Sequence, residues 1–275
     1  MDKLKHIDAF SAAKMAAAIE LIFGFVIAVF IFLFAASLAG VLGPSHLPTF
    51  LRGAAIIIAL PVFLAVVGFM VVAIEAFLYN EISYRTGSIR LDLGKNRGRL
   101  NSIDTMSTAK VFAACGAIVG ALIGIIVAIV GLASGSLRFA ALGVASIFIL
   151  AICLAVGLFV MAVVLVYVYN FVASKIGGVK FSLNGRELSR VDPMSYAKIE
   201  AVIGAIIGFI AGAFRTIAYF ASLSAHTSTA GAFAIITYPI LYFIIGFAST
   251  FVQAWVYNAL VPRIGGVKLT INKSG

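Results

Sequence analysis

The sequence predicts an all-α integral membrane protein in which six transmembrane helices form three tandem helical hairpins, each followed by a short cytoplasmic β-strand. Three observations support this prediction. Hydrophobic residues make up 63% of the 275-residue chain and charged residues only 11%; six long apolar runs divide the chain; and one set of motifs recurs three times. Such a composition lies far outside the range of water-soluble domains. We therefore expect a multi-pass membrane protein.

Each of the six apolar runs is long enough to cross a bilayer, which takes ~20 helical residues. A spanning segment must satisfy its own backbone hydrogen bonds, and the alternating pattern of a membrane barrel is missing, so these runs are expected to be helices. They cover residues 15–39, 54–79, 111–134, 139–169, 199–223 and 230–258.

One polar pattern precedes the first, third and fifth runs: an Asp is followed by a Ser three positions later and a Lys six positions later. The Asp is predicted to cap the helix by accepting hydrogen bonds from its first N–H groups, and the Lys to reach the lipid headgroups. Pro193, directly after one of these Asp residues, suits a first helical turn. A charged substrate-binding triad is the alternative. The residues are Asp8, Ser11 and Lys14; Asp104, Ser107 and Lys110; and Asp192, Ser195 and Lys198.

A Tyr-Asn pair ends the second, fourth and sixth runs. The Tyr is expected in the aromatic belt of the membrane interface, and a Gly seven residues after the Asn is expected to end the helix in a left-handed conformation. Five residues of strict apolar–polar alternation follow, which predicts a half-buried strand that pairs with another such strand or with a partner's edge. The pairs are Tyr79 and Asn80, Tyr169 and Asn170, and Tyr257 and Asn258.

These recurring motifs divide the chain into three copies, residues 1–95, 96–186 and 187–275, each with two transmembrane helices. An even number of spans gives every copy the same orientation, so a pseudo-threefold arrangement about the membrane normal is expected, unlike the inverted repeats of many transporters. We also expect single-copy relatives to form homotrimers.

Small residues recur every four positions in the first helix of each copy, a spacing that favours close helix packing around a common axis. The first copy departs from the pattern, because Glu20 stands where the others have glycine. The glycines are Gly24; Gly116, Gly120 and Gly124; and Gly204, Gly208 and Gly212.

Three polar residues fall inside apolar runs at similar depth: Glu20, Glu75 and Gln253. An ionisable residue within a span is by default a functional hypothesis, because its burial is costly. Two interpretations remain open: the three form a proton or cation site, or a neutral Glu joins helices through hydrogen bonds.

The formal net charge of +10 is placed asymmetrically. Seventeen of the twenty Lys and Arg residues lie near the termini or between copies, and only Arg52, Arg138 and Arg215 lie near the opposite loops. This positive-inside pattern predicts that the N- and C-termini of a plasma-membrane protein lie in the cytoplasm. It also predicts anionic lipid headgroups, rather than nucleic acid, as partners. His46 and His226 are predicted in the outer loops.

The motifs at the two ends of each copy resemble a family of prokaryotic transmembrane domains of unknown function, whose members usually carry one copy. The resemblance covers nearly the whole chain. The first copy departs from it, with Gly87-Ser88 in place of Gly-Gly and Glu20 in the glycine row. The resemblance implies a two-helix unit and no particular activity.

Two functions are compatible with the sequence. The first is a structural, scaffolding or accessory subunit that organises lipids or partner proteins. The second is a small channel or transporter for protons or cations. An enzyme is not expected, because the sequence offers no nucleophile with a base, no metal cluster and no cofactor motif.

Overall fold

The computed structural model describes residues 1–42, 47–94, 97–221 and 231–273 and contains six long helices paired into hairpins. All six are long and apolar enough to cross a membrane, as predicted. His46 and His226 lie outside the described residues. The hairpins are α1 (Ala9–Leu42) with α2 (Leu47–Thr86), α3 (Thr105–Ala133) with α4 (Leu137–Ile176), and α5 (Pro193–Ala221) with α6 (Ala234–Ile264).

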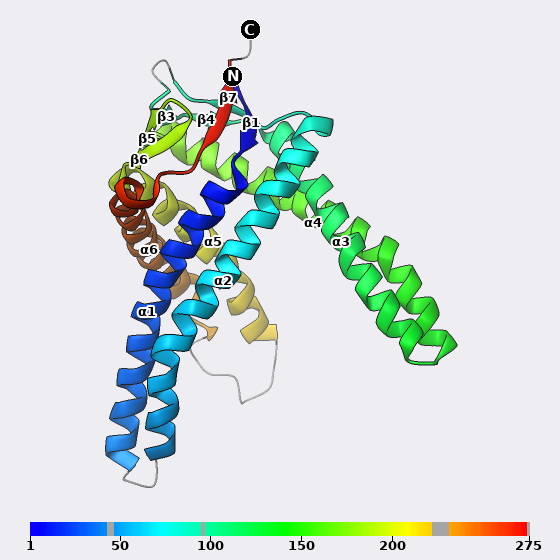
Figure 1. Cartoon of the computed structure of the whole chain (residues 1–275), viewed down its shortest axis with the longest axis vertical. Coiled ribbons are helices and arrows are strands. Elements are labelled where there is room, and N and C mark those ends of the chain that lie inside the picture. Colours follow the sequence, from blue (N-terminus) through cyan, green and yellow to red (C-terminus); the bar gives the residue numbers. More distant parts are fainter. Residues whose placement is uncertain (43–46, 95–96, 222–230, 274–275) are drawn as a thin grey trace.

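Short antiparallel strands gather at one end of the hairpins (Figure 1). One sheet has the order β4-β2-β1-β7 and the other the order β3-β5-β6. The strands are β1 (Asp2–Ile7), β2 (Arg90–Asp92), β3 (Arg99–Leu100), β4 (Ser102–Ile103), β5 (Val179–Asn184), β6 (Glu187–Val191) and β7 (Leu269–Asn272).

The two sheets join into one closed ring of pairings. Only Asn101 separates β3 from β4, so a single segment pairs with β2 on one side and with β5 on the other. On the far side of the ring, an isolated bridge between Glu187 and Lys268 connects β6 to the start of β7. The last strand therefore lies beside the first, and both strands lie above the helices (Figure 1).

A strand follows each hairpin, as predicted: β2, β5 and β7, which we call the trailing strands. Their partners, however, are strands that precede the hairpins, and these were not predicted. These leading segments, residues 2–7, 99–103 and 187–191, break the two-residue period at one corresponding position each. The register shifts around Lys5 and Ser189, and Asn101 interrupts the third segment. Such a bulge disrupts the alternation by which a strand is identified in a sequence.

Two clusters of buried side chains lie where neighbouring hairpins meet beneath the strands. We call the ends of the hairpins next to the strands their feet. One cluster joins Tyr79 and Ile82 of α2 to Val111 of α3, and a second joins Tyr169 of α4 to Ile199 of α5. Away from the strands, the hairpin α3–α4 diverges from α1–α2 (Figure 1). Many large apolar side chains on the diverging parts are exposed, as expected for surfaces that face lipid.

The glycine rows lie within the hairpins, not around a common axis, so that expectation was wrong. A Cβ atom on Gly116 or Gly120 would collide with the backbone of α4, and one on Gly208 would collide with the backbone of α6. Each row thus lets the two helices of one hairpin approach backbone to backbone, which requires residues without side chains. Gly124, Gly204 and Gly212 make the same kind of contact, and Gly24 meets Pro61 of α2.

Candidate functional site

The Asp and Ser residues at the start of each hairpin cap the first, third and fifth helices. An Asp Oδ1 atom accepts a hydrogen bond from the Ser N–H three residues later, at 2.7 Å for Asp8, 2.8 Å for Asp104 and 2.7 Å for Asp192. The bond from Ser11 and the corresponding bond from Ser107 are the largest causes that lower the pKa values of Asp8 and Asp104. Burial opposes this for Asp192, but hydrogen bonds from Ser195 and nearby cations still lower its pKa.

The same Asp-Ser unit also binds one residue of a trailing strand, a role that the sequence did not suggest. At the first junction, the Arg90 N–H donates to Ser107 Oγ at 3.1 Å, and the Asp104 N–H donates to the Arg90 carbonyl at 2.9 Å. Lys180 makes the corresponding bonds at the start of α5, and Lys268 makes them at the start of α1. The start of each hairpin therefore holds the trailing strand of another.

The Tyr residues were expected in the aromatic belt of the membrane interface, but their side chains are buried within the protein. Tyr79, Tyr169 and Tyr257 are each less than 10% exposed. Their hydroxyl groups donate to backbone carbonyls of the leading segments, namely Leu4, Leu100 and Leu188. They fix each leading segment over the foot of its own hairpin.

The neighbouring Asn residues complete this attachment. The Asn170 side chain accepts from the Ile103 N–H and donates to the Ile103 carbonyl, both at 2.8 Å. Asn80 makes the same pair of bonds with Ile7, and Asn258 makes it with Val191. One amide thus satisfies both backbone groups of a residue that directly precedes the capping Asp.

The glycines after the even-numbered helices end them with positive φ angles, but not in the left-handed helical conformation. Gly177 has φ 86° and ψ 150°, and Gly265 has φ 77° and ψ 152°. This extended mirror-image region is open essentially to glycine alone. It turns the chain from helix directly into the trailing strand.

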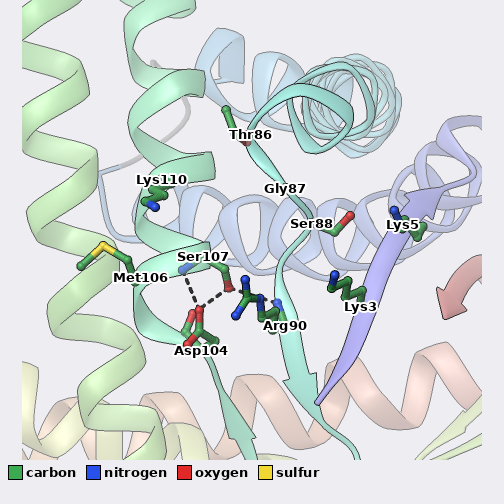
Figure 2. Close-up of a pocket in the computed structure, with 10 residues that line it drawn as sticks. All are labelled: Lys3, Lys5, Thr86, Gly87, Ser88, Arg90, Asp104, Met106, Ser107 and Lys110. Atoms are coloured by element: carbon green, nitrogen blue, oxygen red, sulfur yellow. Dashed lines mark hydrogen bonds between the residues drawn. The ribbon is translucent and has the colours of Figure 1, made fainter. Parts of the chain in front are cut away.

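A basic pocket of 330 Å³ lies at the first junction, between β1, the end of α2, β2 and the start of α3 (Figure 2). Four cationic side chains line it from three separate segments of the chain: Lys3 and Lys5, Arg90, and Lys110. Thr86, Gly87, Ser88, Asp104, Met106 and Ser107 complete the wall. Of the three recurring lysines near the helix starts, Lys110 lines this pocket, and Lys14 and Lys198 do not.

The charge of the basic pocket is poorly compensated. Its one carboxylate, Asp104, is engaged by Ser107, and nearby Asp2 pairs with Arg97 at 3.0 Å. Within the part of the chain that the structure describes, none of the four cations forms an ion pair. An excess of positive charge in a hollow favours an anionic ligand.

The intramembrane polar residues lie in different surroundings. Glu20 packs against Gly68 of α2. A Cβ atom on Gly68 would lie 2.8 Å from the Cγ atom of Glu20, so the glycine makes room for the Glu20 side chain. Glu75 lines an apolar groove of 610 Å³ between α2 and α3, and Gln253 is exposed on α6. No hydrogen bond or ion pair among the described residues joins any two of the three.

Searches with the whole chain found no matching family model, no matching characterised protein and no matching solved structure. The described residues contain no group of three or more His, Cys, Asp or Glu side chains that could hold a metal ion. The site must therefore be interpreted from its own charges and contacts.

Proposed function

We propose that this chain is a non-enzymatic scaffolding or accessory protein of the plasma membrane that gathers anionic lipids around the feet of its hairpins, with both termini in the cytoplasm. The observation that carries the proposal is the one-sided charge. Seventeen of the twenty Lys and Arg residues lie in the sequence near the termini or between the copies, and only three lie near the opposite loops. Basic residues next to transmembrane helices attract anionic headgroups by ~1 kcal/mol each.

The lipids that accompany the protein test this function. The chain is extracted from its membrane in polymer-bounded discs without detergent, and the lipids in the discs are compared with those of the bulk membrane. We expect enrichment of anionic lipids. A control variant, Arg138→Gln/Arg215→Gln, removes two cations near the opposite ends of the hairpins and should leave the enrichment unchanged. Lipid ratios equal to those of the bulk membrane would contradict the proposal.

Orientation is tested separately with single cysteines in a chain lacking Cys115 and Cys153. A membrane-impermeant thiol reagent added to intact cells should label a cysteine at position 46 or 226 and not one at position 273. Labelling of position 273 from outside would reverse the proposed orientation.

We further propose that the three hairpins are copies of one ancestral unit arranged about an approximate threefold axis, because two spans in each copy give all three the same orientation. The support is that the same Asp–Ser, Ser–strand, Tyr–carbonyl and Asn–backbone hydrogen bonds occur once in each copy. A single-copy relative should then form a homotrimer in which the strands of three chains complete the ring. A stable monomer or dimer would argue against this origin.

A channel or transporter for protons or cations is the second candidate, and the position of Glu75 in the groove between α2 and α3 favours it. The absence of any bond joining Glu75 to Glu20 or Gln253 among the described residues weakens it. Proton and cation flux into proteoliposomes decides the matter. Flux that Glu75→Gln abolishes would support transport, and flux no greater than that of empty vesicles would remove this candidate.

A further inference from the structure

We propose that the basic pocket of the first junction is a selective binding site for the phosphomonoester headgroup of an anionic lipid. This inference rests on the proposed lipid-organising function and adds a particular site and ligand class to it. Such a headgroup carries about −1.5 to −2 charges at neutral pH and three strong acceptor oxygens, which match several cations better than a singly charged phosphodiester does.

The four cations converge because of the strand pairing. Lys3 pairs directly with Arg90 across β1 and β2, and Lys5, at the bulge of β1, also lines the pocket. Lys110 follows Ser107 by one turn of α3, and Ser107 Oγ is bound to the Arg90 N–H. Figure 2 shows these side chains around one hollow. Asp104 interacts electrostatically with Arg90 and Lys110, but one carboxylate does not balance four cations, and an anion that enters would reduce their mutual repulsion.

Ser88 adds a neutral polar group to this wall. The residue as a whole is only 6% exposed, and its hydroxyl makes no hydrogen bond within the described part of the chain. Its Oγ atom is not fully enclosed and lines the pocket, so it can donate a hydrogen bond to a phosphate oxygen there.

The other two junctions differ at the corresponding positions. Gly178 and Gly266 stand where the first junction has Ser88, and a Cβ on either would collide with a leading-segment carbonyl, Leu100 or Leu188. The backbones therefore close together where Ser88 requires space. This explains why the first copy departs from Gly-Gly at Gly87-Ser88.

The third junction carries a carboxylate of the chain itself at this place. Glu187 corresponds to Lys3, and its Oε1 atom accepts a hydrogen bond from the N–H of Gly266, which corresponds to Ser88. At the third junction, the carboxylate of Glu187 thus occupies the place that is surrounded by cations at the first junction. The third junction therefore supplies its own anion at this place, whereas the first junction leaves the anion to be supplied by a ligand.

A lipid is the expected source of the phosphate because the apolar groove is formed by the same segments of the chain as the pocket, although the two have no lining residue in common. Leu4, Ile89 and Val111 line the groove, and each is adjacent in the chain to a cation of the pocket. The groove continues along α2 and α3 to Val72 and Val119, which lie within candidate membrane spans. An acyl chain can therefore pack along the helices beside the headgroup site.

Binding is measured with the full chain in nanodiscs of phosphatidylcholine, doped with fluorescent phosphatidic acid or, separately, fluorescent phosphatidylglycerol. The pocket variant Lys3→Gln/Lys110→Gln is compared with Arg99→Gln/Lys198→Gln, which removes two cations from the corresponding positions of the second junction. We expect the pocket variant to weaken phosphatidic acid binding by at least about tenfold, because it removes two of the four cations that would bind the phosphate. The control variant should change it less than twofold.

A second variant keeps all charges. Ser88→Gly restores the residue of the other junctions and should close the pocket, so that binding of phosphatidic acid falls although the net charge is unchanged. Thermal unfolding of each variant verifies that it is folded. Wild-type preference for phosphatidic acid over phosphatidylglycerol supports the headgroup class, and equal binding of the two overturns it.

The remaining outcomes separate the site from the general function. Equal weakening by the pocket and control variants would overturn the pocket while leaving a general attraction for anionic lipids intact. Failure of the wild type to bind either anionic lipid would overturn both. Displacement of the lipid by millimolar glycerol 3-phosphate as effectively as by phosphatidic acid would show that the pocket takes a soluble phosphate, contrary to the proposal.

Discussion

The hydroxyl oxygen of Ser11 accepts a hydrogen bond from the backbone N–H of Lys268 at 3.0 Å, although 257 positions separate the two residues. The Asp8 N–H donates to the carbonyl of the same lysine at 2.9 Å. The last strand of the chain thus completes the foot of the first hairpin, in the way that Arg90 and Lys180 complete the feet of the second and third. The structural unit at each foot is therefore assembled from two different parts of the chain.

Removal of the last strand should loosen the first hairpin, far away in sequence. Deletion of residues 267–275 removes β7 together with its pairs to β1 and the two bonds at Ser11 and Asp8. Each lost hydrogen bond costs ~1 kcal/mol, so we expect a clearly lower unfolding temperature and faster hydrogen exchange at residues 3–7. Deletion of residues 273–275 alone is the control and should have little effect. Unchanged exchange at residues 3–7 would refute this role of β7.

Replacement of the Asn170 amide by a carboxylate should destabilise the folded protein, although the two groups have almost the same size. Asn170→Asp retains an acceptor for the Ile103 N–H but places a carboxylate against the Ile103 carbonyl, which needs a donor. We expect destabilisation of ~1–3 kcal/mol, the range for an unsatisfied buried polar group. Asn184→Asp, at an exposed position of β5, provides the same chemical change without the contact and should be near neutral in chemical unfolding.

Alanine substitutions within one hairpin should have opposite consequences at two glycines. A Cβ on Gly120 collides with the backbone of Leu150, whereas a Cβ on Gly157 meets nothing within 4 Å. We expect Gly120→Ala to destabilise by ~1–3 kcal/mol, as overpacking does. Gly157→Ala should be neutral or stabilising by up to ~1 kcal/mol, because alanine is the better helix former. Equal effects in denaturant titrations would exclude close contact of α3 with α4.

Acid should weaken the feet of the hairpins. The pKa values of Asp8, Asp104 and Asp192 are lowered in the folded protein, so the unfolded chain binds protons more readily than the folded one. Their contribution is complete above the ordinary Asp pKa of ~4 and is lost as the pH falls through the lower folded values. The free energy of unfolding should therefore fall below about pH 4. A triple Asp→Asn variant retains cap acceptors that do not titrate, and its stability should depend less on pH.

The six helices and the trailing strands could be predicted because each depends on a local pattern. An apolar run of sufficient length specifies a spanning helix, and Val179 to Leu183 show uninterrupted alternation. The helix caps were equally local, since Asp104 and Ser107 are three residues apart. These features need no knowledge of what the chain contacts elsewhere.

Other features depend on contacts between distant segments and could not be predicted. The bulge at Lys5 hides the alternation of β1, and nothing local to Tyr169 indicates that its hydroxyl binds Leu100 rather than the membrane interface. The basic pocket combines residues from β1, β2 and α3, which meet only because the strands pair in this order. Its one local signal was the replacement of a glycine by Ser88.

The closed ring of strands depends most directly on the pairing of β7 with β1, which places His6 opposite Thr270. A His6→Cys/Thr270→Cys chain that lacks Cys115 and Cys153 is treated with a mild oxidant in its membrane, with His6→Cys/Ser182→Cys as the control pair. We predict a rapid disulfide within a single chain for the first pair and none for the second. Equal, slow cross-linking of both pairs, or bonds only between different chains, would contradict a ring closed by the two ends of the protein.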